Sequence, residues 1–468
     1  MNLFDYINSY AIRNPNHPAI TTGKEHISYE QLEQYINRAA NYMLSLKYKL
    51  GEVVLLKLTD KKNFILMFLS VLKIGCRVVP IPDDIKPKAL DKLSKRVNAK
   101  GIIDDSTFCE EIFYDTRIST QFDKVIQESE FYHITSGTTG GEKICIRTVE
   151  SLTREGEAYR DALNFTADDI LLGLSPLYHS FALGAILAGA FTSGACIYAV
   201  NKFVPRTALE LIHKERITRL VAVPIMIKLL CVSNTDYQTK INSLRTVLVG
   251  GGPITEEIMG LFKQKFGICI SPTYGSTETG GLLLCNQEQY KKSVGLPLPG
   301  VEVKIVDSEG KAGYRNCQGE LWVRCQGLLR GYLNNPFTVL DEEGYFPMGD
   351  LVYADEKGYI YIVGRIKNMI NIGGKKVNPL EVEEVIKKMD CVKECVVLGL
   401  KQKEKEVIKA VIVPGGNIKE EDVRRHCLNE LESYKLPSII EMHSQLPKNE
   451  MGKIKKDELM EENYGVLS

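Results

Sequence analysis

The sequence predicts an α/β protein with a large N-terminal domain and a small α+β C-terminal domain. The chain has 468 residues, which is more than one compact core usually holds. Predicted strands alternate with predicted helices up to about residue 300, which is typical of layered α/β subdomains with largely parallel sheets. Beyond that point the pattern changes twice, first to short glycine-broken strands and then to a second α+β pattern.

The N-terminal alternation follows from the spacing of apolar residues. Helical spacing over residues 28–46 is preceded by Ser28, a residue type that favours the N-cap of a helix. The further elements that we expect are strand 53–58, helix 64–74, strand 77–80, helix 86–98, strand 101–104, helix 207–216 and strand 219–223.

The short strands after residue 300 predict an antiparallel or small β-barrel-like section, at residues 301–307, 319–325 and 358–365. After Arg365 we expect a helix at 379–389, strands at 393–400 and 407–413, and a helix at 419–432. The predicted division is therefore a domain of residues 1–364, a hinge at 365–368 and a domain of residues 369–468.

Composition argues against several classes of protein. Lys+Arg and Asp+Glu both number 59, so the overall basic surplus of a typical nucleic-acid binder is missing. The most apolar stretches, 64–72 and 182–191, are shorter than the roughly 20 residues that cross a bilayer. They predict buried helices, and without a secretory signal at the N-terminus we expect a cytoplasmic protein with no membrane span.

The cysteines and histidines show no metal-binding pattern. The 12 cysteines contain no C-x-x-C pair, and the seven histidines contain no H-E-x-x-H motif. We therefore expect buried, reduced thiols and no structural zinc site.

The sharpest local feature is the glycine-rich and hydroxyl-rich segment between His133 and Lys143. Glycines let backbone N–H groups approach an anion, hydroxyls add donors, and lysine adds charge, so this composition suits a polyphosphate. The Walker pattern does not fit, because its second glycine would fall on Glu142. On composition alone a flexible surface loop stays an alternative. The residues that carry the phosphate interpretation are Thr135, Ser136, Gly137, Thr138, Thr139, Gly140 and Lys143.

Six ordered motifs make the chain resemble the adenylate-forming superfamily of acyl-CoA synthetases, adenylation domains and luciferases. TSGTTGGEK at 135–143 is similar to the family's T-S-G-T-T-G-x-P-K, and YGSTET at 274–279 to its Y-G-x-T-E. The others are GELWVRCQGLLRGY at 319–332, GYF with GD at 344–350, GRIK with GG at 364–374, and PKNEMGKI at 447–454. The resemblance covers nearly the whole chain. It implies a large core and a small, mobile C-terminal domain.

The resemblance implies a nucleotide site for ATP and Mg²⁺. The loop at 135–143 would embrace the β- and γ-phosphates, with Glu278 and Thr139 holding Mg²⁺, the ion that commonly joins a carboxylate to phosphate oxygens. Asp350 and Arg365 would contact the ribose. The adenine would lie against Tyr274 and a lining of Gly251, Gly252 and Pro253, and Gly275 and Thr277 would also belong to the nucleotide site.

The reaction implied is attack of a carboxylate on the α-phosphorus of ATP. Both partners are anionic, so the site must supply positive charge. By resemblance Lys453 contacts the attacking carboxylate and the α-phosphate, whereas Lys367 occupies the hinge position. Gly373 and Gly374 would let a pantetheine arm approach. The chain departs from the family pattern at several positions. Glu142 replaces the usual proline, and the other departures are Ile144, Pro347-Met348, Asn368 and Met451.

The acid and the thiol are less constrained. His179 in the PLYH segment resembles the gate of the acyl pocket in CoA ligases, although a packed histidine at a helix start is the alternative. No acidic residue follows it closely, and a buried unpaired ammonium is costly. We therefore expect a fatty or aromatic acid rather than an α-amino acid. The expected acceptor is coenzyme A. The alternative acceptor is the phosphopantetheine of an acyl carrier protein. The alternative to an enzyme is a catalytically inactive homologue that only binds its ligands.

Overall fold

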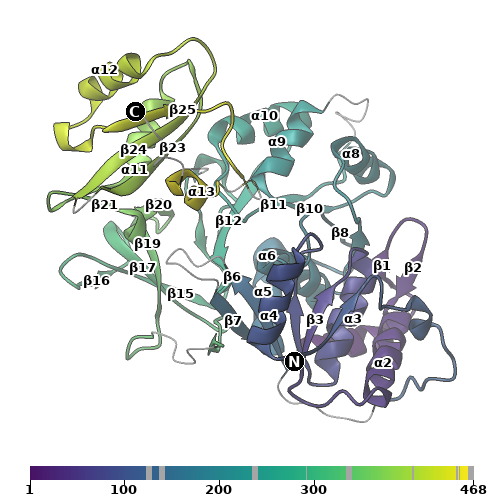
Figure 1. The fold of residues 1–468 in the computed structure, drawn as a ribbon. Coiled ribbons are helices and arrows are strands. Elements are labelled where there is room, and N and C mark those ends of the chain that lie inside the picture. Colours follow the sequence, from purple (N-terminus) through teal and green to yellow (C-terminus); the bar gives the residue numbers. More distant parts are fainter. Residues whose placement is uncertain are drawn as a thin grey trace. The chain divides into compact units, whose positions relative to one another are not determined.

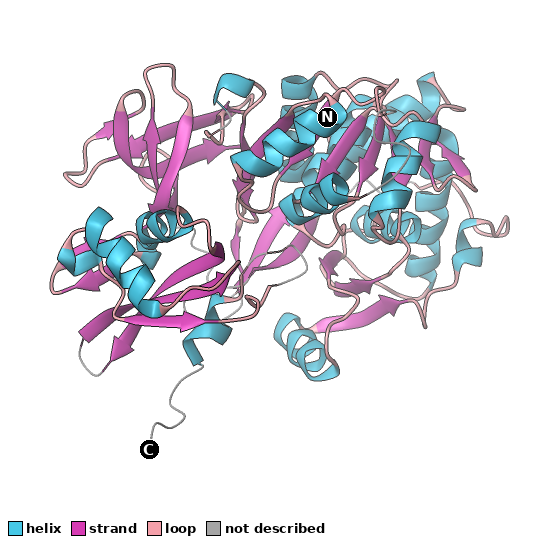
Figure 2. Cartoon of the chain, turned by 90° about the horizontal axis from the view of Figure 1, so that it is seen from above, coloured by secondary structure: helices cyan, strands magenta, loops and turns pink. Residues whose placement is uncertain are grey.

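The computed structural model describes residues 1–122, 129–135, 143–233, 241–290, 292–333, 340–402, 405–448, 452 and 454–461. The chain divides into two compact units. The first comprises Met1–Glu302 with Arg324–Phe346, and the second comprises Val303–Val323 with Pro347–Ser468. Both units mix helices with strands, which Figure 2 shows in separate colours.

The helices of the described chain (Figure 1) are α1 (Leu3–Arg13), α2 (Tyr29–Ser45), α3 (Lys61–Lys73), α4 (Pro87–Val97), α5 (Val149–Leu163), α6 (Ser180–Ala182), α7 (Gly189–Ser193), α8 (Pro205–Lys214), α9 (Pro224–Val232), α10 (Glu256–Phe266), α11 (Pro379–Lys387), α12 (Glu420–Glu430) and α13 (Lys456–Glu461). A π-helical segment, η2 (Leu183–Ala188), joins α6 to α7.

The strands of the first unit are β1 (Pro18–Thr21), β2 (His26–Ser28), β3 (Val53–Lys57), β4 (Arg77–Pro80), β5 (Ala99–Asp104), β6 (Glu130–Thr135), β7 (Lys143–Thr148), β8 (Ile170–Gly173), β9 (Cys196–Ala199), β10 (Arg219–Ala222), β11 (Thr246–Val249), β12 (Ile270–Ser276), β13 (Gly280–Leu284), β14 (Leu296–Pro297) and β18 (Gly331–Tyr332).

The remaining strands lie wholly or mostly in the second unit. They are β15 (Val301–Val306), β16 (Ala312–Gly313), β17 (Cys317–Cys325), β19 (Phe346–Ala354), β20 (Ile360–Arg365), β21 (Ile370–Ile372), β22 (Lys375–Val377), β23 (Val392–Gln402), β24 (Lys405–Pro414) and β25 (Ile439–Met442).

Two sheets form the framework of the first unit. Among the described residues one has the order β14-β13-β12-β11-β10-β8-β9-β1-β2, and the other has the order β18-β7-β6-β4-β3-β5. Neighbours from β12 to β1 pair in parallel, as do neighbours from β6 to β5. Helices on both faces explain why these strands are continuous apolar runs. In β3, Val54 and Leu56 face the main core, whereas Val53 and Leu55 pack with Leu93 of α4.

The second unit contains a five-stranded sheet, β16-β15-β17-β19-β20, and a three-stranded sheet, β23-β24-β25. Both faces of the latter are buried. Val397 and Ile412 pack with α11 and α12 on one face, while Val396 and Val411 pack with Leu459 of α13 on the other. Figure 1 shows these elements together in the green and yellow part of the chain.

The predicted α/β class is confirmed, and each predicted element exists within a few residues of its expected bounds. Ser28 forms a capping box with Gln31 at the start of α2. Both apolar stretches are buried as predicted, within α3 and within α6–η2–α7. No helix among the described residues has the length and apolarity needed to cross a membrane.

All twelve cysteines are reduced, but burial was predicted too broadly, because Cys109 and Cys269 are exposed. The predicted hinge at 365–368 lies inside the second compact unit, between β20 and β21. The predicted division at 365–368 separates a mobile part from a fixed part, whereas the compact units describe only which residues pack together. It therefore stays a prediction.

Candidate active site

The site begins at the carboxyl edge of the larger sheet. Strands β8, β10, β11 and β12 are parallel neighbours, so their C-terminal ends meet at one edge, where α/β proteins bind ligands. His179 follows β8, Gly251 follows β11, and Tyr274 lies near the end of β12. The fold therefore brings together three segments that the sequence had assigned to the acyl and adenine pockets.

Close packing fixes two of these segments against each other. A Cβ atom on Gly250 would lie 2.9 Å from the ring of Phe181 and 2.9 Å from the Thr273 methyl group. Only glycine allows this approach, so the loop after β11 contacts the start of α6. The next three residues, Gly251, Gly252 and Pro253, are exposed, as a surface that lines a nucleotide pocket would be.

A second group forms around the ends of β6 and β7. Thr135 and Lys143 are cross-strand partners. The Nζ atom of Lys143 lies 4.9 Å from the ring centroid of Tyr332, and the Tyr332 hydroxyl donates to Oε1 of Glu278 at 3.1 Å. A lysine, a tyrosine and a carboxylate from three separate segments thus converge. The predicted phosphate-binding residues Ser136, Gly137, Thr138, Thr139 and Gly140 lie outside the described residues, as does Glu142.

Glu278 suits Mg²⁺ in its chemistry. Its half-buried carboxylate is a hard oxygen donor that accepts from Tyr332, and the ring of Tyr332 lies near Lys143. In the described part of the chain no cluster of three or more His, Cys, Asp or Glu side chains could enclose an ion. In the usual magnesium arrangement, one or two carboxylates are complemented by phosphate oxygens and water, so the binding of Mg²⁺ by Glu278 stays a prediction.

Two histidines lie behind the carboxyl edge. Burial lowers the pKa of His179 to about 4, and its Nε2 atom has no hydrogen-bond partner within the described chain. His133 on β6 is 2% exposed, and neither of its ring nitrogens has such a partner. Burial, followed by the nearby charges of Arg147 and His179, lowers the pKa of His133 to about 3. Both imidazoles are therefore neutral at pH 7.

A buried ion pair joins the two sheets beside these histidines. Arg147 on β7 and Glu155 on α5 lie 2.9 Å apart, with side chains 0% and 1% exposed. Glu155 also accepts from the backbone N–H of Gly281 at 2.9 Å. It adjoins Gly184, where a Cβ atom would lie 1.9 Å from its Oε1 atom. The pair thus links β7, α5, β13 and η2 below the site.

In the second unit, Asp350 and Arg365 are cross-strand partners on β19 and β20. The Nε atom of Arg365 donates to Oδ1 of Asp350 at 2.7 Å, and Nη2 donates to Oδ2 at 3.4 Å. Asp350 is 2% exposed. Here the carboxylate engages the guanidinium with both oxygens, so binding of the ribose by Asp350 stays a prediction.

The predicted hinge and pantetheine residues are on the surface. Lys367 is exposed in a short 3₁₀ turn. Gly373 and Gly374 form the exposed turn between β21 and β22, with φ of 57° and 89°. A Cβ atom on either would meet nothing within 4 Å. Within this unit the glycines are therefore required by the backbone conformation of the turn, not by close packing. Their contact with pantetheine stays a prediction.

The predicted catalytic lysine, Lys453, lies outside the described residues. The segments on either side of it pair with each other, through a bridge between Lys448 and Ile454 and a hydrogen bond from the Lys455 N–H to the Pro447 carbonyl at 2.9 Å. Helix α13 follows immediately.

Sequence reasoning missed several site residues. Tyr332 was part of a quoted motif but had no role, and His133 was only the first residue of the phosphate loop. Arg147, Glu155 and Lys61 carried no signal. Glu155 also contacts Gly281, and Lys61 contacts Gly173; these partners lie more than a hundred residues away in sequence, so only the fold reveals them.

Comparison with known families agrees with this geometry. The model of the AMP-binding enzyme family matches residues 8–333, and that of the AMP-binding enzyme C-terminal domain matches residues 381–453. The chain belongs to the AMP-binding enzyme family. It is a member of the adenylate-forming superfamily and an AMP-forming acid–thiol ligase, as the motifs predicted.

This AMP-binding enzyme is similar to curated proteins along nearly its full length. YdaB of Bacillus subtilis, provisionally named an acyl–CoA ligase, is 30% identical over 94% of this chain and 95% of its own. The 4-coumarate–CoA ligase of Pinus taeda is 26% identical over 92% and 89% of the two chains. The long-chain-fatty-acid–CoA ligase FadD13 of Mycobacterium tuberculosis is 26% identical over 93% of each.

Solved structures also resemble this AMP-binding enzyme. ATP-bound MatB from Rhodopseudomonas palustris superposes with a TM-score of 0.89 and 25% identity over 98% of this chain and 99% of that one. O-succinylbenzoate coenzyme A synthetase from Bacillus subtilis, in complex with AMP, gives a TM-score of 0.86 at 22% identity over 99% of each chain, which shows the shared fold.

Proposed function

We propose that this protein activates a fatty or aromatic carboxylic acid with ATP, forms the acyl-AMP with release of pyrophosphate, and transfers the acyl group to coenzyme A. One observation carries the proposal: relatives aligned over nearly the whole chain are named as CoA ligases of chemically different acids, 4-coumarate and long-chain fatty acids. The common element of these names is the reaction, while the acid differs.

In the proposed first step, a carboxylate oxygen of the acid bonds to the α-phosphorus, and the bond from the α-phosphorus to the bridging oxygen breaks to release pyrophosphate. Lys453 neutralises charge as the transition state forms, and Lys143 attracts the phosphates. Glu278 and Thr139 would hold Mg²⁺, which supplies further positive charge at the phosphate oxygens. In the second step the thiolate sulfur attacks the acyl carbonyl carbon, and AMP leaves.

The proposed acid class follows from the lining of the carboxyl edge. The segments that the resemblance assigns to the acyl pocket are mostly apolar and include Val221, Val249 and Leu183, and an apolar lining favours an apolar acyl group. Glu155 adjoins this lining at Gly184 but is paired with Arg147, so its charge is already compensated. It therefore offers little to a substrate ammonium group.

The proposal is tested by acid-dependent pyrophosphate release with Mg·ATP. The panel contains octanoate, 4-coumarate, benzoate and alanine, each with and without coenzyme A, and thioester is detected by mass spectrometry. Release with octanoate or an aromatic acid, and thioester on addition of coenzyme A, is the expected result. Release without a CoA thioester would point to a carrier protein as acceptor. No release with any acid would contradict the proposal and favour the inactive alternative.

A further inference from the structure

A half-buried lysine, whose ammonium group points inward, holds the loop that leads into the site. Lys61 is the first residue of α3, and its Nζ atom donates to three consecutive carbonyl oxygens, those of Gly173 at 2.8 Å, Leu174 at 3.3 Å and Ser175 at 3.1 Å. These three residues end β8 and begin the loop toward His179. One side chain therefore fixes the chain where it leaves the carboxyl edge.

The loop beyond these carbonyls is short and continues directly into the acyl segment. The Leu174 N–H donates to the Val221 carbonyl at 3.0 Å, and the His179 N–H donates to the Pro176 carbonyl at 3.2 Å. The N–H groups of Ala182 and Leu183 then donate to the carbonyl of His179. A shift at residues 173–175 would therefore be transmitted to His179 and Phe181.

The base of Lys61 is itself held. Its backbone N–H donates to Oδ1 of Asn201 at 2.9 Å, and Asp60 caps α3 while accepting from Asn201. Burial lowers the pKa of the Lys61 ammonium to about 7. Placing a lysine here carries a desolvation cost, which the three carbonyl contacts offset. An apolar residue that only filled space at this position would carry no such desolvation cost.

We propose that Lys61 is a positioning residue for the acyl pocket, because its ammonium group anchors residues 173–175 and through them His179 and Phe181. The inference rests on the proposed function, in which the segment from His179 lines the acyl pocket. Lys61 touches neither the acid nor the nucleotide in this role and acts through the backbone of the loop.

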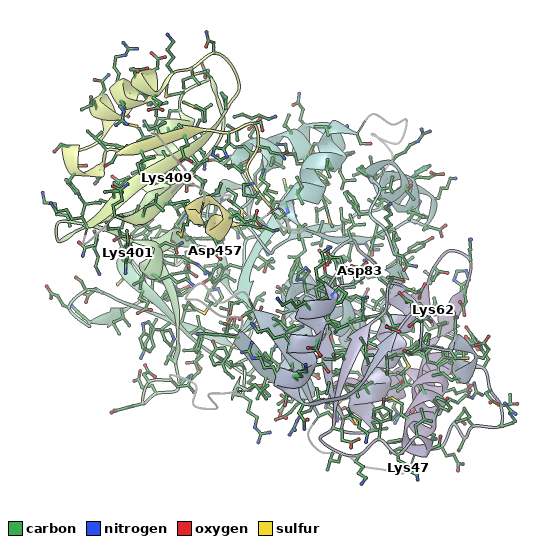
Figure 3. All side chains as sticks on the ribbon, in the orientation of Figure 1. Lys47, Lys62, Asp83, Lys401, Lys409 and Asp457 are labelled. Carbon is green, nitrogen blue, oxygen red and sulfur yellow. The ribbon has the colours of Figure 1, made fainter. Side chains whose placement is uncertain are left out.

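The chain offers a matched control in the adjacent lysine. Lys62, labelled in Figure 3, is 5% exposed and pairs with Glu25 at 2.8 Å and with Glu110. Lys62→Met therefore removes a buried lysine from the same helix turn without touching residues 173–175. Lys61→Met removes the three carbonyl contacts, and Lys61→Arg keeps a cationic donor.

Hydrogen–deuterium exchange tests the anchoring without any enzyme assay. In Lys61→Met, exchange at residues 173–183 should accelerate about tenfold, which corresponds to ~1.4 kcal/mol of local stability. Lys62→Met should leave that segment protected, and Lys61→Arg should restore part of the protection. Unchanged protection in Lys61→Met would overturn the proposal. Should that variant fail to fold, Lys61→Gln enters the same comparison with the same criteria.

Kinetics test the positioning role. With the panel acid that the wild type uses best, Lys61→Met should raise the KM for the acid about tenfold and leave the KM for ATP within about twofold. Lys62→Met should change neither KM. Equal effects of the two substitutions on the KM for the acid would reduce Lys61 to a stabilising residue. If wild type turns over no acid, the proposed function fails, while the exchange measurement still decides whether Lys61 anchors the loop.

Discussion

Tyr332 lies between Lys143 and Glu278, so removal of its hydroxyl tests whether this group positions the Glu278 carboxylate. Burial, and then the negative charge of Glu278, raises the pKa of the Tyr332 phenol, which keeps it protonated as a donor. Tyr332→Phe should weaken the positioning of Glu278 by the roughly 1 kcal/mol of one hydrogen bond. We expect a several-fold higher KM for Mg·ATP, measured across magnesium concentrations, with an unchanged Tm. An unchanged KM at all magnesium concentrations would contradict this role.

Arg147 and Glu155 form a buried pair whose members depend on each other. Arg147→Met should lower the free energy of unfolding by about 3 kcal/mol, because it leaves a buried carboxylate uncompensated. The double variant Arg147→Met, Glu155→Leu should recover much of this loss. Urea denaturation of the two variants provides the measurement. A double variant less stable than Arg147→Met would show that Glu155 has further stabilising contacts that outweigh its charge.

The two buried histidines predict a dependence of stability on pH. Their pKa values of about 3 and about 4 lie below the ordinary 6.5, so the unfolded chain binds protons first as the pH falls. The folded protein is therefore most stable above pH 6.5, and this stability is lost as the pH falls toward the folded pKa values. Each of the two histidines lowers the free energy of unfolding by about 2 kcal/mol between pH 7.5 and pH 5. His133→Leu should reduce the loss between pH 7.5 and pH 5 by that amount in urea titrations, and an unchanged loss would show that His133 is not the group responsible.

At the scale of elements, the sequence predicted strands and helices well but not the contacts that join them. Strand β4 begins and ends where apolar spacing placed it, at Arg77 and Pro80. The strand patterns were clear because both sheet faces are buried, and the N-caps of α2 and α3 are local signals. Partners such as Lys61 with Gly173 lie about a hundred residues apart in the chain, and no local pattern encodes them.

Helix α13 begins three residues after Lys453, so its anchoring bears on the position of this lysine. Lys409 on β24 is 1% exposed, pairs with Glu441 at 2.8 Å and donates to the Leu459 carbonyl at 3.1 Å. Lys409→Met should lower the free energy of unfolding by about 3 kcal/mol, because it leaves the Glu441 carboxylate without its buried cation. It should also slow adenylate formation, because α13 loses its anchor.

The exposed Lys401, labelled with Lys409 in Figure 3, supplies the control. Lys401→Met should change neither the free energy of unfolding nor the rate of adenylate formation. Full adenylation activity in Lys409→Met would show that α13 does not need this anchor.

At the scale of the whole molecule, the residues predicted for the site come from both compact units. The carboxyl edge of the larger sheet, with His179 and Tyr274, belongs to the first unit, whereas Asp350 and Arg365 belong to the second. Ordered motifs predicted both groups because each keeps its local spacing. The contact between Tyr332 and Glu278 was not predictable, because its distance depends on how β18 pairs with β7.

The two proposed half-reactions make different demands on Lys453. Adenylation brings together two anions, so it needs the lysine charge, whereas attack of a thiol on the acyl-adenylate releases AMP and does not. Lys453→Ala should therefore abolish acid-dependent pyrophosphate release, by at least about a hundredfold, yet spare thioester formation from supplied acyl-adenylate and coenzyme A. The two rates are measured separately on the same preparation, with Lys455→Ala as a control from the same basic run. Equal loss of both half-reactions in Lys453→Ala would mean that this lysine supports the fold or both steps alike, and the assigned role would be wrong.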